Sequence, residues 1–175
     1  MPHYIRSHVP GGTFFFTAAL LERRRGLLVE RIEDLREAFR AVRATRPFRI
    51  DAIVVLPDHL HCIWTLPPDD PDFPTRWRLI KTRFAKSLPA VERLSTTRAA
   101  KGERAIWQRR FWEHTIRDEA DHAAHVDYIH FNPVKHGYAR RAADWQHSSF
   151  HRFVADGLLP LDWGAAPAIR TLDYE

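Results

Sequence analysis

The sequence predicts an α+β fold: a ferredoxin-like βαββαβ antiparallel sheet, followed by one further helix and a C-terminal extension. Short runs rich in aromatic and β-branched residues are typical of strands. They alternate with longer segments whose apolar residues recur every three or four positions, as in amphipathic helices. The order is strand, helix, strand, strand, helix, strand, helix, and the first six elements form the split βαβ arrangement with helices on one face. Strands are predicted at residues 13–20, 49–56, 60–66 and 106–116, and helices at residues 29–44, 75–88 and 117–131.

The first half of the chain supplies a strand, a helix and a hairpin. The strand follows Gly11-Gly12 and ends before an arginine cluster at residues 23–25. The helix ends before Pro47. The dipeptide Pro57-Asp58 is typical of turns and lies between two β-rich runs, which should pair as a hairpin. The apolar stripe of the helix consists of Ile32, Leu35, Phe39 and Val42.

The second half adds a helix, a strand and the last helix. A proline-rich loop at residues 67–74 precedes the second helix, and residues 89–103 lack a clear period, so we expect a mobile, basic loop there. An aromatic run then predicts the fourth strand. Asp118 and Glu119 favour the first turn of the last helix, which should stop at Asn132-Pro133.

Size and charge point to one basic domain. The chain of 175 residues is 45% hydrophobic, which suits a single domain over residues 1–175, with a core at about 10–138 and an extension at about 139–175. Its net charge of +5 comes mainly from arginine, which favours a polyanionic partner, although a merely soluble basic surface is the alternative. Candidate DNA-phosphate contacts are Arg76, Arg78, Lys81, Arg83 and Lys86 on the second helix, with Arg109, Arg110 and Lys135.

The cysteine count and hydropathy limit the class of protein. Cys62 is the only cysteine, which excludes disulfides and cysteine-rich zinc clusters and fits a reducing compartment. No apolar run reaches the roughly 20 residues of a membrane helix, and the N-terminus lacks a secretory apolar region. We therefore expect a cytoplasmic, nucleoid-associated protein without membrane contact.

Two histidines separated by one apolar residue form the main chemical signal. Side chains alternate along a strand, so His59 and His61 should project from one face of the hairpin. Neutral imidazole is a common metal ligand, and the pair would make half of a metal site. Exposed histidines on a strand edge are the alternative.

A tyrosine and an asparagine on the last helix could complete that site. Tyr128 and Asn132 are four residues apart and therefore share a helix face. With His59 and His61, the amide oxygen of Asn132 would give three ligands and leave positions open for a phosphate oxygen and water, which suits Mg²⁺ or Mn²⁺. The alternatives are a tyrosine packed in the core and an asparagine that only stops the helix.

Together these motifs resemble the REP-associated tyrosine transposases, a branch of the IS200/IS605 transposase-like family of single-tyrosine HUH endonucleases. The resemblance spans residues from about 4 to 163. One departure is Asn132, because the IS200/IS605 transposases usually carry glutamine four residues after the tyrosine. The similar blocks are residues 10–17, Leu56-Pro57-Asp58-His59-Leu60-His61, Arg110-Phe111-Trp112-Glu113-His114, residues 128–137 and residues 145–150.

The resemblance implies a function and a substrate. Tyr128 would be the nucleophile, His59, His61 and Asn132 the metal ligands, and single-stranded DNA folded into repetitive extragenic palindromes (REP) the substrate. Attack on a phosphodiester would give a 5′-phosphotyrosine and a free 3′-OH, so nicking could be reversed by strand transfer. The rivals are a non-catalytic nucleic-acid-binding module of ferredoxin-like fold and an initiator of replication or plasmid transfer. We expect a monomer, with a dimer as the alternative.

Overall fold

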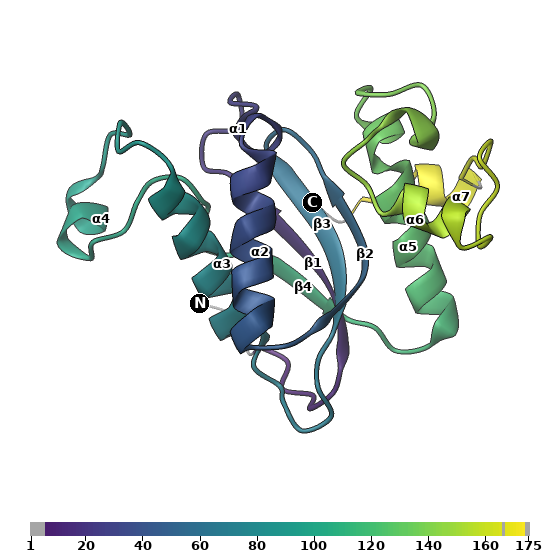
Figure 1. Cartoon of the computed structure of the whole chain (residues 1–175), viewed down its shortest axis with the longest axis horizontal. Helices are drawn as coiled ribbons and strands as arrows, with labels where there is room; N and C mark the ends of the chain where they lie inside the picture. Colours follow the sequence, from purple (N-terminus) through teal and green to yellow (C-terminus); the bar gives the residue numbers. More distant parts are fainter. Residues whose placement is uncertain (1–5, 166, 174–175) are drawn as a thin grey trace.

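A four-stranded antiparallel sheet forms the centre of the molecule in the computed structural model, which describes residues 6–165 and 167–173. The strands are β1 (Thr13–Ala19), β2 (Arg49–Val55), β3 (His59–Thr65) and β4 (Trp112–Thr115), in the spatial order β2-β3-β1-β4. This is the predicted ferredoxin-like arrangement, which Figure 1 shows together with the helices on either side. The predicted α+β fold is confirmed.

The register of the strands decides which side chains share a face. β2 and β3 form the predicted hairpin, and Thr17 of β1 lies directly opposite His61 of β3. On the other side of β1, Phe15 lies opposite His114 of β4. Since side chains alternate, Phe15, Thr17, His61 and His114 all belong to one face of the sheet.

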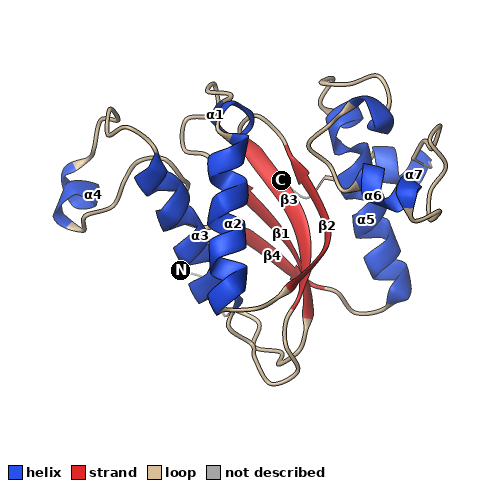
Figure 2. Cartoon of the chain, in the orientation of Figure 1, coloured by secondary structure: helices blue, strands red, loops and turns tan. Residues whose placement is uncertain are grey.

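Helices cover both faces of the sheet (Figure 2). One face packs against α2 (Ile32–Thr45) and α3 (Phe73–Ser87), around a core that includes Phe16 and Trp64. The chain breaks at Arg31, so the helix predicted at residues 29–44 is two helices, the first being the short α1 (Leu27–Glu30). The opposite face packs against α5 (Glu119–Lys135) around a smaller core that includes Phe15 and Ile63.

The segment between α3 and β4 differs from the prediction. Within the expected loop lies α4 (Thr96–Ala100), and the segment is held by Arg104, whose guanidinium pairs with Glu92 and donates to the carbonyl oxygens of Leu88 and Pro89. The predicted fourth strand is also too long, because only Trp112–Thr115 pairs with β1 as a strand. The preceding residues instead contact the end of β1 through a single bridge between Leu20 and Trp107.

The last predicted helix does not stop at Asn132-Pro133. α5 continues through Pro133 and ends at Lys135. Gly137 lies just beyond the C-cap residue, and its φ of 74° is in the left-handed region that glycine adopts readily. The amides of Gly137 and Tyr138 donate to the carbonyls of Val134 and Pro133, which is a Schellman motif.

The C-terminal segment returns to the sheet edge. It contains η1 (Ala142–Asp144), α6 (Phe150–Ala155) and α7 (Pro167–Arg170), which lie beside α5 in Figure 1. Backbone bonds from Ser149 to Ile53 and from Val55 to His147 join this segment to β2. Within the described ranges, no helix is both long enough and apolar enough to cross a membrane.

Candidate active site between the sheet and α5

His59 and His61 lie together under α5. Their side chains emerge from the same face of β3, with ring centroids 5.0 Å apart, and both residues are fully buried. Alternation along the strand is the cause, as the sequence predicts. The pair is therefore an interior feature and not a surface decoration of a strand edge.

Neighbouring side chains fix the orientation of both rings. His61 Nδ1 lies 2.7 Å from Thr17 Oγ1, and His59 Nδ1 lies 2.7 Å from Asp58 Oδ1. Burial raises the pKa of Asp58, but hydrogen bonds from His59 and Arg23 outweigh it, and the pKa is lowered overall. The ionised Asp58 thus accepts the Nδ1 proton of His59, and Nε2 is the ring atom that would ligate a metal.

Two residues of α5 and the residue that caps its C-terminus face this pair at intervals of four. The Tyr128 ring lies 5.2 Å from His61, and the His136 ring lies 5.0 Å from His59. Asn132 is one helical turn from each, so it lies on the face of α5 that the histidines contact. Sequence reasoning gave His136 no place in the site, although its spacing from Asn132 was a usable signal.

Asn132 has the environment of a ligand side chain. The residue is fully buried, and within the described part of the chain neither its Oδ1 nor its Nδ2 has a hydrogen-bond partner. Leaving such atoms unpaired costs roughly 1–3 kcal/mol for each group. Two oriented imidazoles and this amide oxygen form a donor set that fits a divalent metal ion.

Lys135 lies at the tyrosine. Its Nζ is 3.3 Å from the Tyr128 hydroxyl and 5.0 Å from the centre of the ring, and it is 3.2 Å from Asp173 Oδ1. The sequence suggested a phosphate contact for Lys135. In the structure its ammonium adjoins the phenolic oxygen, where it can stabilise negative charge.

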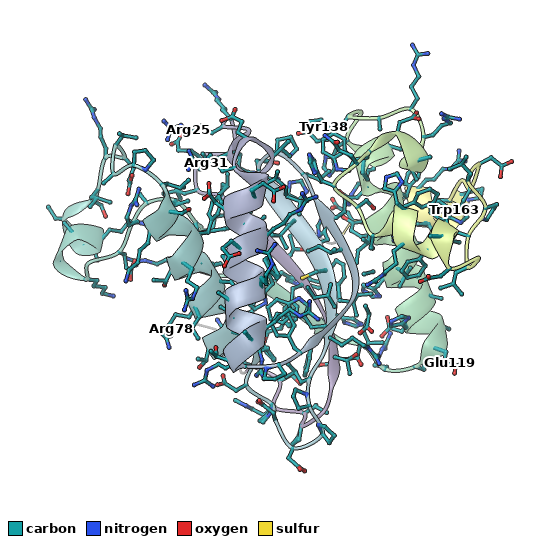
Figure 3. All side chains as sticks on the ribbon, viewed as in Figure 1. Arg25, Arg31, Arg78, Glu119, Tyr138 and Trp163 are labelled. Carbon is teal, nitrogen blue, oxygen red and sulfur yellow. The ribbon has the colours of Figure 1, made fainter. Side chains whose placement is uncertain are left out.

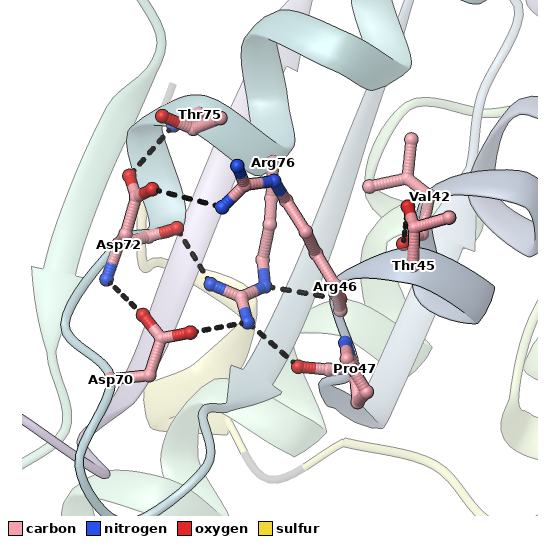
Figure 4. Close-up of polar contacts among 8 residues, drawn as sticks. All are labelled: Val42, Thr45, Arg46, Pro47, Asp70, Asp72, Thr75 and Arg76. Atoms are coloured by element: carbon pink, nitrogen blue, oxygen red, sulfur yellow. Dashed lines mark hydrogen bonds and ion pairs between the residues drawn. The ribbon is translucent and has the colours of Figure 1, made fainter.

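Arg76 is buried and does not belong to the expected DNA-binding surface. It is 1% exposed, and its guanidinium donates to the carbonyl oxygens of Arg46, Pro47 and Asp72 and to the carboxylate of Asp70 (Figure 4). The guanidinium is buried and makes four hydrogen bonds within the protein, so Arg76 joins α3 to the end of α2 and is not available to phosphate. A charge pattern along a helix could not reveal these acceptors, because they come from other segments.

The remaining basic residues that were expected to contact DNA differ in their exposure to solvent. Lys81 is half-buried, donates to the carbonyl of Gln108 and lies over Trp107, and burial, with the charge of Arg6, lowers its pKa to about 8. Arg78 projects from α3 away from the sheet (Figure 3), on the face opposite α5. The exposed candidates are Arg78, Arg83, Lys86, Arg109 and Arg110, of which Arg109 pairs with Glu103.

Two known sequences and one solved structure are similar to most of this chain. The chain is 50% identical over 163 residues to a REP-associated tyrosine transposase of Escherichia coli (strain K12), covering 93% of this chain and 91% of the relative. It is 42% identical over 171 residues to a Haemophilus influenzae protein provisionally given the same name, covering 97% of each chain. A solved REP-associated tyrosine transposase bound to a REP hairpin superposes with a TM-score of 0.82 at 49% identity, covering 95% of this chain and 93% of that one. No family model matches the sequence.

Proposed function

The chain belongs to the REP-associated tyrosine transposases, and on that premise we propose that it nicks and rejoins single-stranded DNA at REP-like hairpins through a 5′-phosphotyrosine. Its family makes it a transposase, and the solved relative is bound to a REP hairpin. The observation that carries the proposal is the contact between Tyr128 and His61, with ring centroids 5.2 Å apart. It joins a nucleophile to a pair of potential ligands in one buried site.

Tyr128 performs the covalent step in this proposal. Its phenolic oxygen forms a bond to the scissile phosphorus while the bond from phosphorus to the 3′ oxygen breaks, and the leaving oxygen takes up a proton as the 3′-OH. The phosphodiester energy is retained in the tyrosine ester, so a 3′-OH can reverse the step without a nucleotide cofactor. Both nicking and strand transfer follow from the same chemistry.

Lys135 activates the nucleophile. A free tyrosine has a pKa near 10 and is mostly protonated at neutral pH. An ammonium within hydrogen-bond reach of the oxygen favours the phenolate over the phenol, because opposite charges attract in a site of low dielectric. The 3.3 Å contact between Lys135 and Tyr128 supports this role.

The metal ligands in this proposal are His59, His61 and Asn132. We expect Mg²⁺ or Mn²⁺, since the amide oxygen and a DNA phosphate oxygen are hard ligands, and Mn²⁺ accepts imidazole more readily than Mg²⁺ does. When bound, such an ion supplies polarisation of the scissile phosphate. Thr17 and Asp58 orient the two imidazoles through their Nδ1 atoms.

The chain is proposed to act as a monomer and to hold the DNA through exposed cations. His61 and Tyr128 meet within one chain, which supports a site that needs no second copy. Because α3 lies across the sheet from Tyr128, its exposed cations would bind duplex or flanking DNA away from the cleaved phosphate. The proposed phosphate contacts are Arg78, Arg83, Lys86, Arg109 and Arg110.

Trapping of a covalent adduct tests the function. The protein is incubated with Mn²⁺ and an end-labelled single-stranded REP-like hairpin, and the products are separated on a denaturing gel. We expect an adduct with the unmodified protein and with Tyr138→Phe, a control that alters an exposed tyrosine, and none with Tyr128→Phe. An adduct on Tyr128→Phe would refute the assignment, and hairpin binding without any adduct would favour the non-catalytic module.

A further inference from the structure

A second cluster of potential metal ligands lies beside the site. It consists of His114 on β4 and of Asp121 and His125 in the first turns of α5. One ligand atom from each residue lies within 4.8 Å of those of the other two, and no other such histidine, cysteine or carboxylate grouping occurs in residues 6–165 and 167–173. Asp121 and His125 are four residues apart, which puts both side chains on one helix face.

The cluster is separate from the His59 and His61 pair. The Phe15 ring lies between them, with its centroid 4.8 Å from His125 and 5.6 Å from His61. His114 and His125 stack face to face, with centroids 4.7 Å apart and ring planes inclined by 13°. Asp121 contacts both rings, since its Oδ2 is 2.8 Å from His114 Nε2 and its Oδ1 is 3.1 Å from His125 Nδ1.

We propose that His114, Asp121 and His125 form a second metal site, which takes a transition-metal ion such as Zn²⁺ or Co²⁺ with water completing the coordination. Two imidazoles and one carboxylate are a ligand set that such ions accept, whereas Mg²⁺ prefers oxygen ligands. Ligand atoms on a tetrahedral ion with bonds of about 2 Å are roughly 3.4 Å apart. The three ligand atoms already lie within 4.8 Å of one another, so small side-chain adjustments would bring them to this spacing.

The protonation states are those that metal binding requires. Burial raises the pKa of Asp121, but hydrogen bonds from His114 and from the Arg117 backbone outweigh it and lower the pKa to about 2. Burial also lowers the pKa of His125. The Nδ1 of His125 lies 2.8 Å from the backbone oxygen of Asp121, to which it donates its proton, so Nε2 carries the lone pair that would ligate a metal.

At this location, between β4 and α5, the ion would have a structural role. His125 is three residues before Tyr128 on α5, and His114 belongs to the edge strand β4. An ion held by all three would join that strand to the helix that carries the nucleophile. It would stabilise the folded chain without taking part in phosphate chemistry.

Metal titration of a protein lacking the first site tests this proposal. In His59→Ala/His61→Ala, we expect one equivalent of Co²⁺ to bind, with visible d–d absorption of low-coordinate cobalt, and Zn²⁺ to raise the melting temperature. Adding His125→Gln should abolish both effects. Adding His122→Gln should leave them unchanged, because His122 is on the same helix but outside the cluster.

The folded state of each variant is checked by circular dichroism in EDTA, and His114→Gln provides a second variant if His125→Gln does not fold. No Co²⁺ binding by His59→Ala/His61→Ala would overturn the proposal. Equal binding after His125→Gln or His114→Gln would overturn it as well. Neither readout depends on DNA cleavage, so failure here leaves the proposed transposase chemistry untouched.

Discussion

The Lys135 ammonium lies 3.3 Å from the phenolic oxygen of Tyr128, seven residues earlier on the same helix. Two helical turns bring both side chains to one face of α5. The proposed nucleophile therefore has a positively charged neighbour within its own helix.

Removing that charge should slow cleavage. For Lys135→Met we expect a single-turnover rate lower by roughly ten- to a hundredfold, the effect of losing one hydrogen bond from a charged group. The pH of half-maximal rate should move upward, because the phenolate loses its partner. Lys135→Arg should recover part of the rate, and Lys101→Met, in an exposed loop, is the matched control. A pH–rate profile that is unchanged in Lys135→Met would exclude the role.

Thr17 should tune metal affinity through His61. Its hydroxyl is 2.7 Å from His61 Nδ1, and loss of such an orienting contact weakens metal binding by roughly ten- to a hundredfold. Thr17→Val should raise the Mn²⁺ concentration for half-maximal cleavage by that factor. Thr13→Val on the same strand removes a hydroxyl pair with Thr65 instead and should leave the Mn²⁺ requirement unchanged. Similar metal dependence in both variants would contradict the prediction.

Asn132 should limit stability when no metal is bound. Asn132→Leu replaces a buried amide without hydrogen-bond partners in the described structure by an apolar side chain of similar size. In EDTA the free energy of unfolding should stay equal or rise by up to about 1–3 kcal/mol, while adduct formation is lost. Urea unfolding provides the measurement. A clear destabilisation in EDTA would mean that the amide has a structural task.

Two neighbouring arginines of α3 should behave in opposite ways. Arg76→Met removes the four hydrogen bonds that the buried guanidinium donates and should cost about 2–4 kcal/mol of stability. Arg78→Gln alters an exposed side chain and should cost less than about 0.5 kcal/mol, but it should reduce the slope of log affinity against log salt for hairpin DNA by about 1. Thermal unfolding and salt-dependent binding distinguish the two. A stable Arg76→Met with weakened DNA binding would restore the original expectation for Arg76.

His130 should make the fold sensitive to acid. Burial, with the charges of Arg152 and His151, lowers its pKa to about 3, against about 6.5 when unfolded. Between these values the unfolded chain binds the extra proton, so the contribution of His130 is complete above pH 6.5 and falls as pH decreases toward 3. The loss should be about 2 kcal/mol between pH 6.5 and 5. His130→Phe should flatten this dependence in urea unfolding, whereas His122→Gln should not.

The sequence by itself determined the order of the four strands and the main helices, and it paired the candidate site residues locally. Strand alternation was enough to put His59 and His61 on one face, and helical spacing was enough to align Tyr128 with Asn132. These relations depend only on backbone geometry over a few residues. The same local rules misjudged the end of α5, because the stop is the left-handed Gly137 and not Pro133.

Only the tertiary structure decided how the helix and the strands that carry these residues pack against one another. The placement of α5 over β3 brought Tyr128 to His61, and strand register brought Thr17 to the same imidazole. Burial of Arg76 depends on carbonyls of Arg46 and Pro47, which are about thirty residues away in the chain. Such contacts form between segments whose relative positions follow from packing of the whole core. No spacing within one segment can encode them.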